Sequence, residues 1–354
     1  MAILFAILLF SLLIFVHELG HFLAAKESKV QVNEFAMFMG PALLKKKVGE
    51  TVYSLRCIPI GGFCAMEGED TDTENPRSFQ KAAWWKRLII LVAGSLMNFI
   101  AGFLLLFIVF SCTFRFIPTP VIDHFDAGCT LNGESGLQVG DRIVEVDGER
   151  IYVNSDISMM LSLNPGNVHD LVVERNGQRV ILNDFVMEPK AFPNEDGTTS
   201  LRYGLNFKTE DAHFGNLLEY TANSSLNVVR TVRLSLQMLI TGQAGFSDMS
   251  GPVGIVQQMS SVADSSETTA DAILNMFYFG GFIAINLAVM NMLPIPALDG
   301  GRVVALLLTS AIEAIIHRKI NPKYEGYIHT AGMILLLGFM AIVMFKDIFV
   351  IFTR

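Results

Sequence analysis

The chain has 354 residues, of which 51% are hydrophobic and 17% are charged. This composition excludes an ordinary soluble protein, because several apolar runs are long enough to cross a bilayer core of about 30 Å. The net charge of −8 and the absence of a basic cluster argue against nucleic acid as a partner. The four cysteines, Cys57, Cys64, Cys112 and Cys129, show no C-x-x-C spacing, so they indicate neither a zinc knot nor a disulfide framework.

The first apolar run, from Met1 to about Ala25, is predicted to be a retained membrane span and contains an H-E-x-x-H motif. His17 and His21 are four residues apart, so a helix places both on one face, where they can bind one metal ion. Glu18 is close enough to accept a proton from water at that metal without being a ligand. Such residues are costly inside a membrane and are therefore expected to be functional. The alternative is a pair of interfacial histidines at a helix end.

Residues 30–66 alternate short apolar and polar stretches and are predicted to form β-hairpins. Two interpretations of these strands are open. An exposed edge beside the H-E-x-x-H helix can pair with an unfolded substrate segment. Alternatively, the strands form a small cytoplasmic flap that does not touch substrate.

The second span is predicted at about residues 88–110, after an aromatic and basic anchor at residues 84–87. Asn98 lies inside this span. We interpret it as the donor or acceptor of a hydrogen bond between helices, in preference to a catalytic residue.

From residue 115 to about 271 the chain is soluble in character and acidic, and a compact domain fits between about 118 and 209. Asn176-Gly177 between two β-branched runs predicts a hairpin. Residues 214–240 are predicted to form an amphipathic helix along the membrane surface. The Gly251-Pro252-Val253-Gly254 segment is predicted to break that helix, with a polar loop following to Thr269.

The third span, at about residues 272–293, runs into two prolines and two glycines around Asp299. These residues predict unwound backbone, which is tolerated at membrane depth only when buried in protein or facing a water-filled cavity. Asp299 is therefore predicted to complete a two-histidine, one-carboxylate zinc site whose fourth position is left for water. The alternative is that Asp299 caps a helix beginning near Val303.

The last span is predicted at about residues 327–349, with His329 at its entrance interpreted as interfacial and without function. Orientation follows from the basic residues of two loops: Lys26, Lys29, Lys45, Lys46, Lys47, Lys86 and Arg87 between spans one and two, and Arg318, Lys319 and Lys323 between spans three and four. Both loops are predicted to be cytoplasmic. The acidic region and both termini are then extracytoplasmic, and the metal site lies near the cytoplasmic face.

With His17-Glu18-x-x-His21 in one span and Asn291-x-x-Pro-x-Pro-x-x-Asp299-Gly-Gly after another, the whole sequence resembles the site-2 protease family, and especially its bacterial RseP-type intramembrane zinc metalloproteases. Residues 50–63 are similar to the family's membrane-associated β-region. Residues 136–151 resemble the core of a single PDZ domain, and residues 250–255 resemble a segment that follows it. Phe38 stands where many members carry glycine.

The resemblance implies that His17, His21 and Asp299 bind zinc and that Glu18 is the general base. It also implies that Asn286 and Asn291 contact substrate or stabilise the transition state, although hydrogen bonding between helices is an alternative for both. The implied substrates are single-pass membrane proteins whose outer domain has been removed, such as anti-sigma factors, and remnant signal peptides. The implied location is the bacterial plasma membrane.

The predicted fold is a multi-pass α-helical membrane protein with four transmembrane helices, a membrane-associated β-hairpin region and an inserted extracytoplasmic PDZ domain. The predicted parts are residues 1–114 (first half of the membrane core), 115–210 (PDZ domain), 211–270 (amphipathic helix and linker) and 271–354 (second half of the core). The predicted function is that of a zinc-dependent intramembrane endopeptidase. Two alternatives are an inactive scaffold that presents its PDZ domain and a metal transporter, which would not need Glu18 and would be expected to show an internal repeat.

Overall fold

The computed structural model describes residues 2–69, 73–164, 166–193, 198–245, 251–264, 266, 268–317 and 323–353. The chain forms two compact units, one of residues 1–109 with 231–354 and the other of residues 110–230. Each unit is described by itself.

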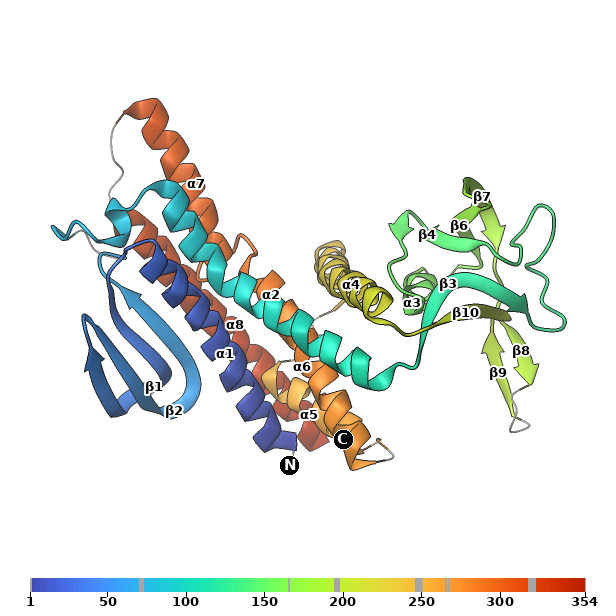
Figure 1. The fold of residues 1–354 in the computed structure, drawn as a ribbon, viewed down its shortest axis with the longest axis horizontal. Coiled ribbons are helices and arrows are strands. Elements are labelled where there is room, and N and C mark those ends of the chain that lie inside the picture. The colour runs from blue at the N-terminus through green and yellow to red at the C-terminus, as the bar shows by residue number, and fades with distance from the viewer. Residues whose placement is uncertain are drawn as a thin grey trace. The chain divides into compact units, whose positions relative to one another are not determined.

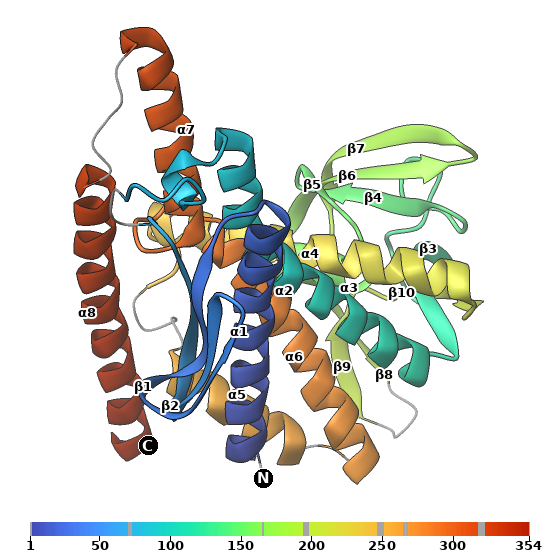
Figure 2. The same ribbon diagram turned by 60° about the vertical axis from the view of Figure 1, so that its left-hand side comes forward.

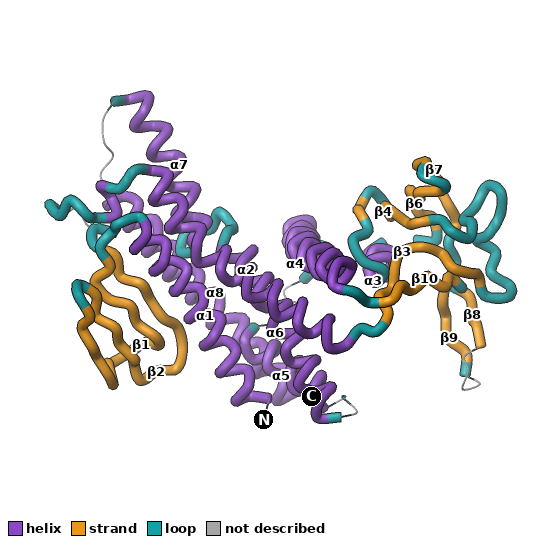
Figure 3. Tube along the Cα trace, in the orientation of Figure 1, coloured by secondary structure: helices purple, strands orange, loops and turns teal. Residues whose placement is uncertain are grey.

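The first unit is built mainly of helices (Figures 1 and 3). They are α1 (Ala2–Glu27), α2 (Trp84–Thr113), α5 (Pro252–Asp264), α6 (Thr269–Asn291), α7 (Asp299–Ile316) and α8 (Lys323–Thr353), with a short 3-10 turn, η1 (Phe79–Lys81). Four stretches are long and apolar enough to cross a membrane: Phe5–Glu27, Trp84–Thr113, Thr269–Asn291 and Gly326–Phe349. The four predicted spans are therefore confirmed, with ends that differ by a few residues.

Helix α5 contradicts the predicted polar loop after residue 254. Its first turn is held by a distant side chain, because the Asp347 carboxylate of α8 accepts hydrogen bonds from the backbone N–H groups of Gly251 (2.9 Å) and Gly254 (3.0 Å). A carboxylate at a helix N-terminus satisfies N–H groups that have no partner within the helix. Its Met259 side chain is buried in a cluster with Leu9 and Leu13 of α1. The sequence prediction failed because these contacts come from residues far away in the chain.

Strands β1 (Val32–Val48) and β2 (Thr51–Met66) occupy the region predicted to be β-structure. The first half of β1 lies between two parts of β2, so that Phe35 is opposite Cys64 on one side and Tyr53 on the other. Phe38 has a φ of 72°, which is the left-handed region that favours glycine. Glycine adopts this backbone conformation more readily than phenylalanine does.

The sheet packs along α1, as Figures 1 and 2 show. The ring of Phe35 lies 5.0 Å from that of Phe22 and 5.8 Å from that of Phe15, measured between ring centroids. These aromatic contacts place the strands on one side of the helix that carries the H-E-x-x-H motif.

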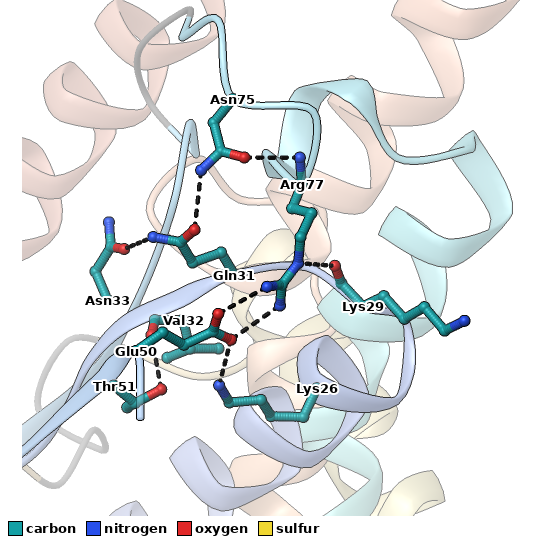
Figure 4. A network of polar contacts seen from close by, with 9 residues as sticks. All are labelled: Lys26, Lys29, Gln31, Val32, Asn33, Glu50, Thr51, Asn75 and Arg77. Atoms are coloured by element: carbon teal, nitrogen blue, oxygen red, sulfur yellow. Dashed lines mark hydrogen bonds and ion pairs between the residues drawn. The ribbon is translucent and has the colours of Figure 1, made fainter. Parts of the chain in front are cut away.

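A polar network fixes the turn of the sheet to the end of α1 (Figure 4). Glu50 accepts hydrogen bonds from Lys26 (2.8 Å) and from both terminal nitrogens of Arg77 (2.7 and 2.9 Å). Arg77 also donates to the carbonyl of Lys29 at 3.2 Å. The hydrogen bonds and charges of Arg77 and Lys26 lower the pKa of Glu50 from its usual 4.5 to about 2.

The second unit contains a β-sheet whose strand pairs are antiparallel, one short helix and the first part of a long helix. Its elements are β3 (Phe116–Phe125), β4 (Arg142–Val146), β5 (Glu149–Arg150), α3 (Ser155–Leu163), β6 (Val168–Arg175), β7 (Gln178–Val186), β8 (Lys190–Pro193), β9 (Thr199–Arg202), β10 (Leu205–Asp211) and the first part of α4 (Phe214–Thr241). The strand order is β10-β3-β4-β6-β7, with β5 paired to β4. Asn176 and Gly177 both have positive φ between β6 and β7, which confirms the predicted hairpin.

The amphipathic helix α4 was also predicted, and its first part belongs to the second unit. Arg230 of α4 forms a buried ion pair of 3.0 Å with Asp156 at the start of α3. Asp156 additionally accepts the backbone N–H groups of Tyr152 (2.7 Å) and Val153 (3.0 Å). A buried charge is tolerated when it is paired and hydrogen-bonded in this way, so the pair attaches α4 firmly to the compact unit.

Candidate metal centre

Three metal-ligating side chains converge on one point in the first unit. His17 and His21 lie one turn apart on α1, and Asp299 is the first residue of α7. The Nε2 atoms of the two histidines are 3.3 Å apart. Oδ2 of Asp299 lies 3.2 Å from Nε2 of His17 and 3.3 Å from Nε2 of His21. Residues almost 280 positions apart in sequence therefore present three donor atoms to a common centre.

The hydrogen-bond partner of His21 identifies which ring nitrogen is available for a metal. Nδ1 of His21 is 2.8 Å from the backbone carbonyl oxygen of Ile90. A carbonyl only accepts, so Nδ1 carries the hydrogen and Nε2 of the neutral ring keeps its lone pair. That lone pair faces Asp299 and His17. A backbone carbonyl that orients a histidine through its second nitrogen is a common arrangement around protein-bound metals.

The spacing of the donor atoms fits zinc. Donors about 2.0–2.1 Å from a tetrahedral zinc ion lie roughly 3.3–3.4 Å from one another. The three measured separations are 3.2–3.3 Å. Oδ2 of Asp299 is buried and has no hydrogen-bond partner within the described part of the chain, and the same holds for Nδ1 of His17. Two imidazoles and one carboxylate are the ligand set of catalytic zinc sites that leave a fourth position open.

The position of Asp299 in the structure favours its interpretation as a ligand over that as a helix cap. Helix α7 begins at Asp299 rather than near Val303, and its N-cap residue is Leu298, whose side chain makes no capping hydrogen bond. The carboxylate of Asp299 points to the histidines instead. Residues 292–298, called here the 292–298 turn, are not helical, as the prolines and glycines predicted.

The absence of a side chain at Gly94 makes room for His21. A Cβ atom at this position of α2 would overlap the His21 ring at Nε2 and would lie 2.7 Å from its Cδ2 and Cε1 atoms. These distances are well inside van der Waals contact, so Gly94 allows α2 to pack directly against the metal-binding ring. The same helix supplies the Ile90 carbonyl, so α2 both supports and orients this histidine.

Glu18 lies beside the sheet as well as beside His17. A Cβ atom at Gly62 of β2 would be 3.3 Å from Cγ of Glu18 and 3.4 Å from Ile14. The second half of β2 therefore approaches α1 at the level of the H-E-x-x-H motif. This contact places the strands beside the helix that carries the motif.

The other residues singled out by the sequence lie in α2, α6 and α8. Asn286 lies within α6, and Asn291 is its last residue, directly before the 292–298 turn. Asn98 is buried in α2, but its Oδ1 has no hydrogen-bond partner in the described ranges, so the predicted bond between helices is not found for that atom. His329, interpreted from the sequence as interfacial, accepts a hydrogen bond at Nδ1 from the backbone N–H of Ala297 at 3.2 Å.

Sequence reasoning also missed Arg302 and Glu69. Arg302 lies one turn after Asp299 and forms an ion pair with Glu69, which follows β2. The Glu69 backbone carbonyl accepts a hydrogen bond of 3.0 Å from Gln80. A charged residue three positions after a ligand is a weak signal by itself. Its partner is 233 residues away, so only the tertiary structure reveals the pair.

Histidine and carboxylate donors held among helices apolar enough to span a membrane define a membrane-embedded metallohydrolase site. The model of peptidase family M50 matches residues 5–339. The chain thus belongs to peptidase family M50, the site-2 protease family.

Several relatives match over nearly their full length. A Clostridium perfringens protein, provisionally named a zinc metalloprotease, is 35% identical over 355 residues and matches across 98% of each chain. A Fusobacterium nucleatum protein with the same provisional name is 32% identical over 361 residues and matches across 100% of each chain. The regulator of sigma-W protease RasP of Bacillus subtilis is 28% identical over 428 residues, with 97% of each chain covered.

Proposed function

We propose that this protein is a zinc-dependent endopeptidase that hydrolyses peptide bonds within the transmembrane segments of single-pass membrane proteins. The observation that carries the proposal is the convergence of two histidine Nε2 atoms and one carboxylate oxygen at 3.2–3.3 Å. Membership of peptidase family M50 and the names of the relatives support the same activity.

The roles of the residues follow from their chemistry and position. His17, His21 and Asp299 hold zinc. The Ile90 carbonyl of α2 orients the His21 ring, and the missing side chain at Gly94 leaves room for that ring. Bound there, zinc supplies Lewis-acid chemistry, polarising a peptide carbonyl and making water more acidic.

Glu18 acts as general base and then as general acid. It removes a proton from the water whose oxygen forms the new bond to the carbonyl carbon. When the C–N bond breaks, Glu18 returns that proton to the leaving amine. Asn291 and Asn286 of α6 are proposed to hold the substrate backbone near the 292–298 turn through their amide groups.

The substrates we propose are membrane proteins whose outer domain has already been removed, including anti-sigma factors and signal-peptide remnants. The name of the Bacillus subtilis relative, a regulator of sigma-W protease, supports the first class. The second unit is proposed to be an extracytoplasmic PDZ domain that docks or filters substrates. The active site is proposed to lie near the cytoplasmic face of a bacterial plasma membrane.

Cleavage of a single-span model substrate by purified protein in detergent tests the proposal. Wild type, Glu18→Gln and Asp299→Ala are compared, and the zinc content of each is measured. We expect wild type to cut, Glu18→Gln to keep zinc but lose cleavage by at least about 100-fold, and Asp299→Ala to lose zinc.

Two results would contradict specific parts of the proposal. If Asp299→Ala retains full zinc and activity, Asp299 is not the third ligand. If wild type binds zinc and cuts none of several ectodomain-trimmed substrates, a scaffold or a transporter explains the protein better. In that case Glu18→Gln should leave partner binding or metal transport unchanged.

A further inference from the structure

The 292–298 turn before Asp299 contains a residue in an unusual backbone conformation. Ala297 has a φ of 89°, which is in the left-handed region that side chains rarely adopt. Such conformations persist only where surrounding contacts determine them, and they concentrate at functional sites. Ala297 is two residues from Asp299, so whatever fixes its backbone also helps to set the direction of the Asp299 carboxylate.

One face of α8 contacts this turn at two points. The backbone N–H of Ala297 donates to Nδ1 of His329 at 3.2 Å. Three residues further on, a Cβ atom at Gly332 would lie 2.7 Å from the carbonyl carbon and oxygen of Pro296, closer than van der Waals contact allows. Residues three apart share one face of a helix, so His329 and Gly332 lie on the face of α8 that contacts Pro296 and Ala297.

We propose that His329 is a positioning residue for catalysis, which fixes the 292–298 turn so that Asp299 meets His17 and His21 in the geometry of a zinc site. The inference rests on the proposed function, because it takes Asp299 as a metal ligand. His329 touches neither the ligands nor the reacting atoms and acts through the backbone of Ala297.

The hydrogen bond has a defined chemical requirement. The N–H of Ala297 needs an acceptor, and the Nδ1 lone pair of a neutral imidazole supplies one. An aliphatic side chain removes the acceptor and leaves that N–H without it, which favours relaxation of the left-handed residue. Oδ2 of Asp299 must stay near 3.2–3.3 Å from two nitrogens, so a small rotation of the turn separates the three donors.

The test compares His329→Leu, which removes the acceptor, with His329→Asn, whose Oδ1 can take the place of Nδ1. The control is Thr330→Val on the same turn of α8, since the Thr330 hydroxyl is exposed and donates only within its own helix, to Gly326 at 2.8 Å. The readouts are apparent zinc affinity by competition with a chelator, kcat and KM for a single-span substrate, and the thermal unfolding midpoint.

We expect His329→Leu to bind zinc at least tenfold more weakly and to lose kcat with a smaller change in KM, because the amide groups proposed to hold substrate belong to α6 and not to the turn itself. His329→Asn should recover most of both values, and Thr330→Val should match wild type. Gly332→Ala, which displaces Pro296 without removing the acceptor, should reproduce the loss of zinc affinity. Equal zinc affinity in wild type and His329→Leu would overturn the proposal, as would equal losses in the Leu and Asn variants.

A double variant separates this inference from the proposed function. If both are right, Asp299→Ala lowers zinc affinity and adding His329→Leu lowers it no further, because the ligand that His329 positions is already gone. If Asp299→Ala alone keeps full zinc affinity, the assignment of the ligand is wrong and the inference falls with it. If Asp299→Ala loses zinc while His329→Leu does not, only the positioning role is wrong.

Discussion

His21 shows how a candidate metal ligand within a membrane span is fixed from two sides. Its Nδ1 is committed to the carbonyl of Ile90, and its ring lies against the bare backbone of Gly94. Helix α2 therefore determines both the tautomer of the His21 ring, through Ile90, and the position of that ring, through Gly94. A change at Gly94 is expected to act on metal binding without altering any ligand.

We predict that Gly94→Ala weakens zinc binding by about 5- to 100-fold and lowers cleavage in parallel. The added methyl group overlaps the His21 ring, and overpacking of this kind typically costs about 1–3 kcal/mol. Chelator competition measures the zinc affinity, and cleavage of a single-span substrate measures the activity.

The matched control for Gly94 is Gly338→Ala in α8, another helical glycine with no atom within 4 Å of an added Cβ. This variant should bind zinc like wild type. Unchanged zinc affinity in Gly94→Ala would show that the ring has room to move, and that the close packing of α2 does not hold the site.

At the scale of elements, the β1–β2 sheet depends on its attachment to α1. The attachment has an apolar part, made by Phe35 against α1, and a polar part centred on Glu50. Glu50 sits in the turn between the strands and pairs with Lys26 of α1 and with Arg77. Because the strand containing Gly62 lies against Glu18, this attachment also fixes one wall of the candidate site.

The polar part should make the stability of the protein depend on acidity. The folded pKa of Glu50 is lowered to about 2 from a usual 4.5. A lowered carboxylate pKa contributes stability above pH 4.5, and this contribution is lost as the pH falls from there towards 2. We therefore predict that Glu50→Gln lowers the thermal unfolding midpoint in detergent at pH 7, and that its difference from wild type shrinks between pH 4.5 and 2.5.

Glu27→Gln is the control for this titration, since Glu27 is exposed at the same end of α1. Its unfolding midpoint should follow that of wild type across the same pH range. A difference between Glu50→Gln and wild type that is constant from pH 7 to pH 2.5 would exclude the ion-paired carboxylate as its cause.

For the whole molecule, the distribution of basic residues predicts the orientation in the membrane. Lys26 lies at the end of the first span, Lys86 at the start of the second and Lys46 in the chain between them, whereas Arg318 and Lys319 lie outside the described residues. Loops rich in lysine and arginine stay in the cytoplasm. The second unit is then predicted to be extracytoplasmic.

We predict that a membrane-impermeant maleimide labels Glu134→Cys but not Lys46→Cys in intact spheroplasts, in a variant whose four native cysteines are replaced by alanine. Both positions are exposed, so access depends on the side of the membrane. Permeabilised membranes, in which both positions should react, provide the control. Labelling of Lys46→Cys alone in intact spheroplasts would reverse the proposed orientation.

The sequence by itself predicts the features that depend on interactions between residues close together in the chain. Four spans follow from apolar length, and the hairpin at Asn176-Gly177 follows from the positive φ that both residues adopt. The candidate site residues His17, Glu18 and His21 are predicted from helical spacing, and Asp299 is predicted from the need for a third ligand beside helix-breaking residues. Each inference needs only residues close together in the chain or the known dimensions of a bilayer.

Only the tertiary structure revealed the residues that hold these parts in place. The first turn of helix α5 is bonded to Asp347, the backbone of Ala297 to His329, Arg302 to Glu69, and Nδ1 of His21 to the Ile90 carbonyl. In sequence, His21 and Ile90 are 69 residues apart, Gly251 and Asp347 are 96 apart, and Glu69 and Arg302 are 233 apart. Ala297 and His329 are 32 residues apart. In the sequence, Asp347, Arg302 and His329 have no distinguishing feature. The partner of each one comes from a distant element, so the contact appears only when the chain is packed.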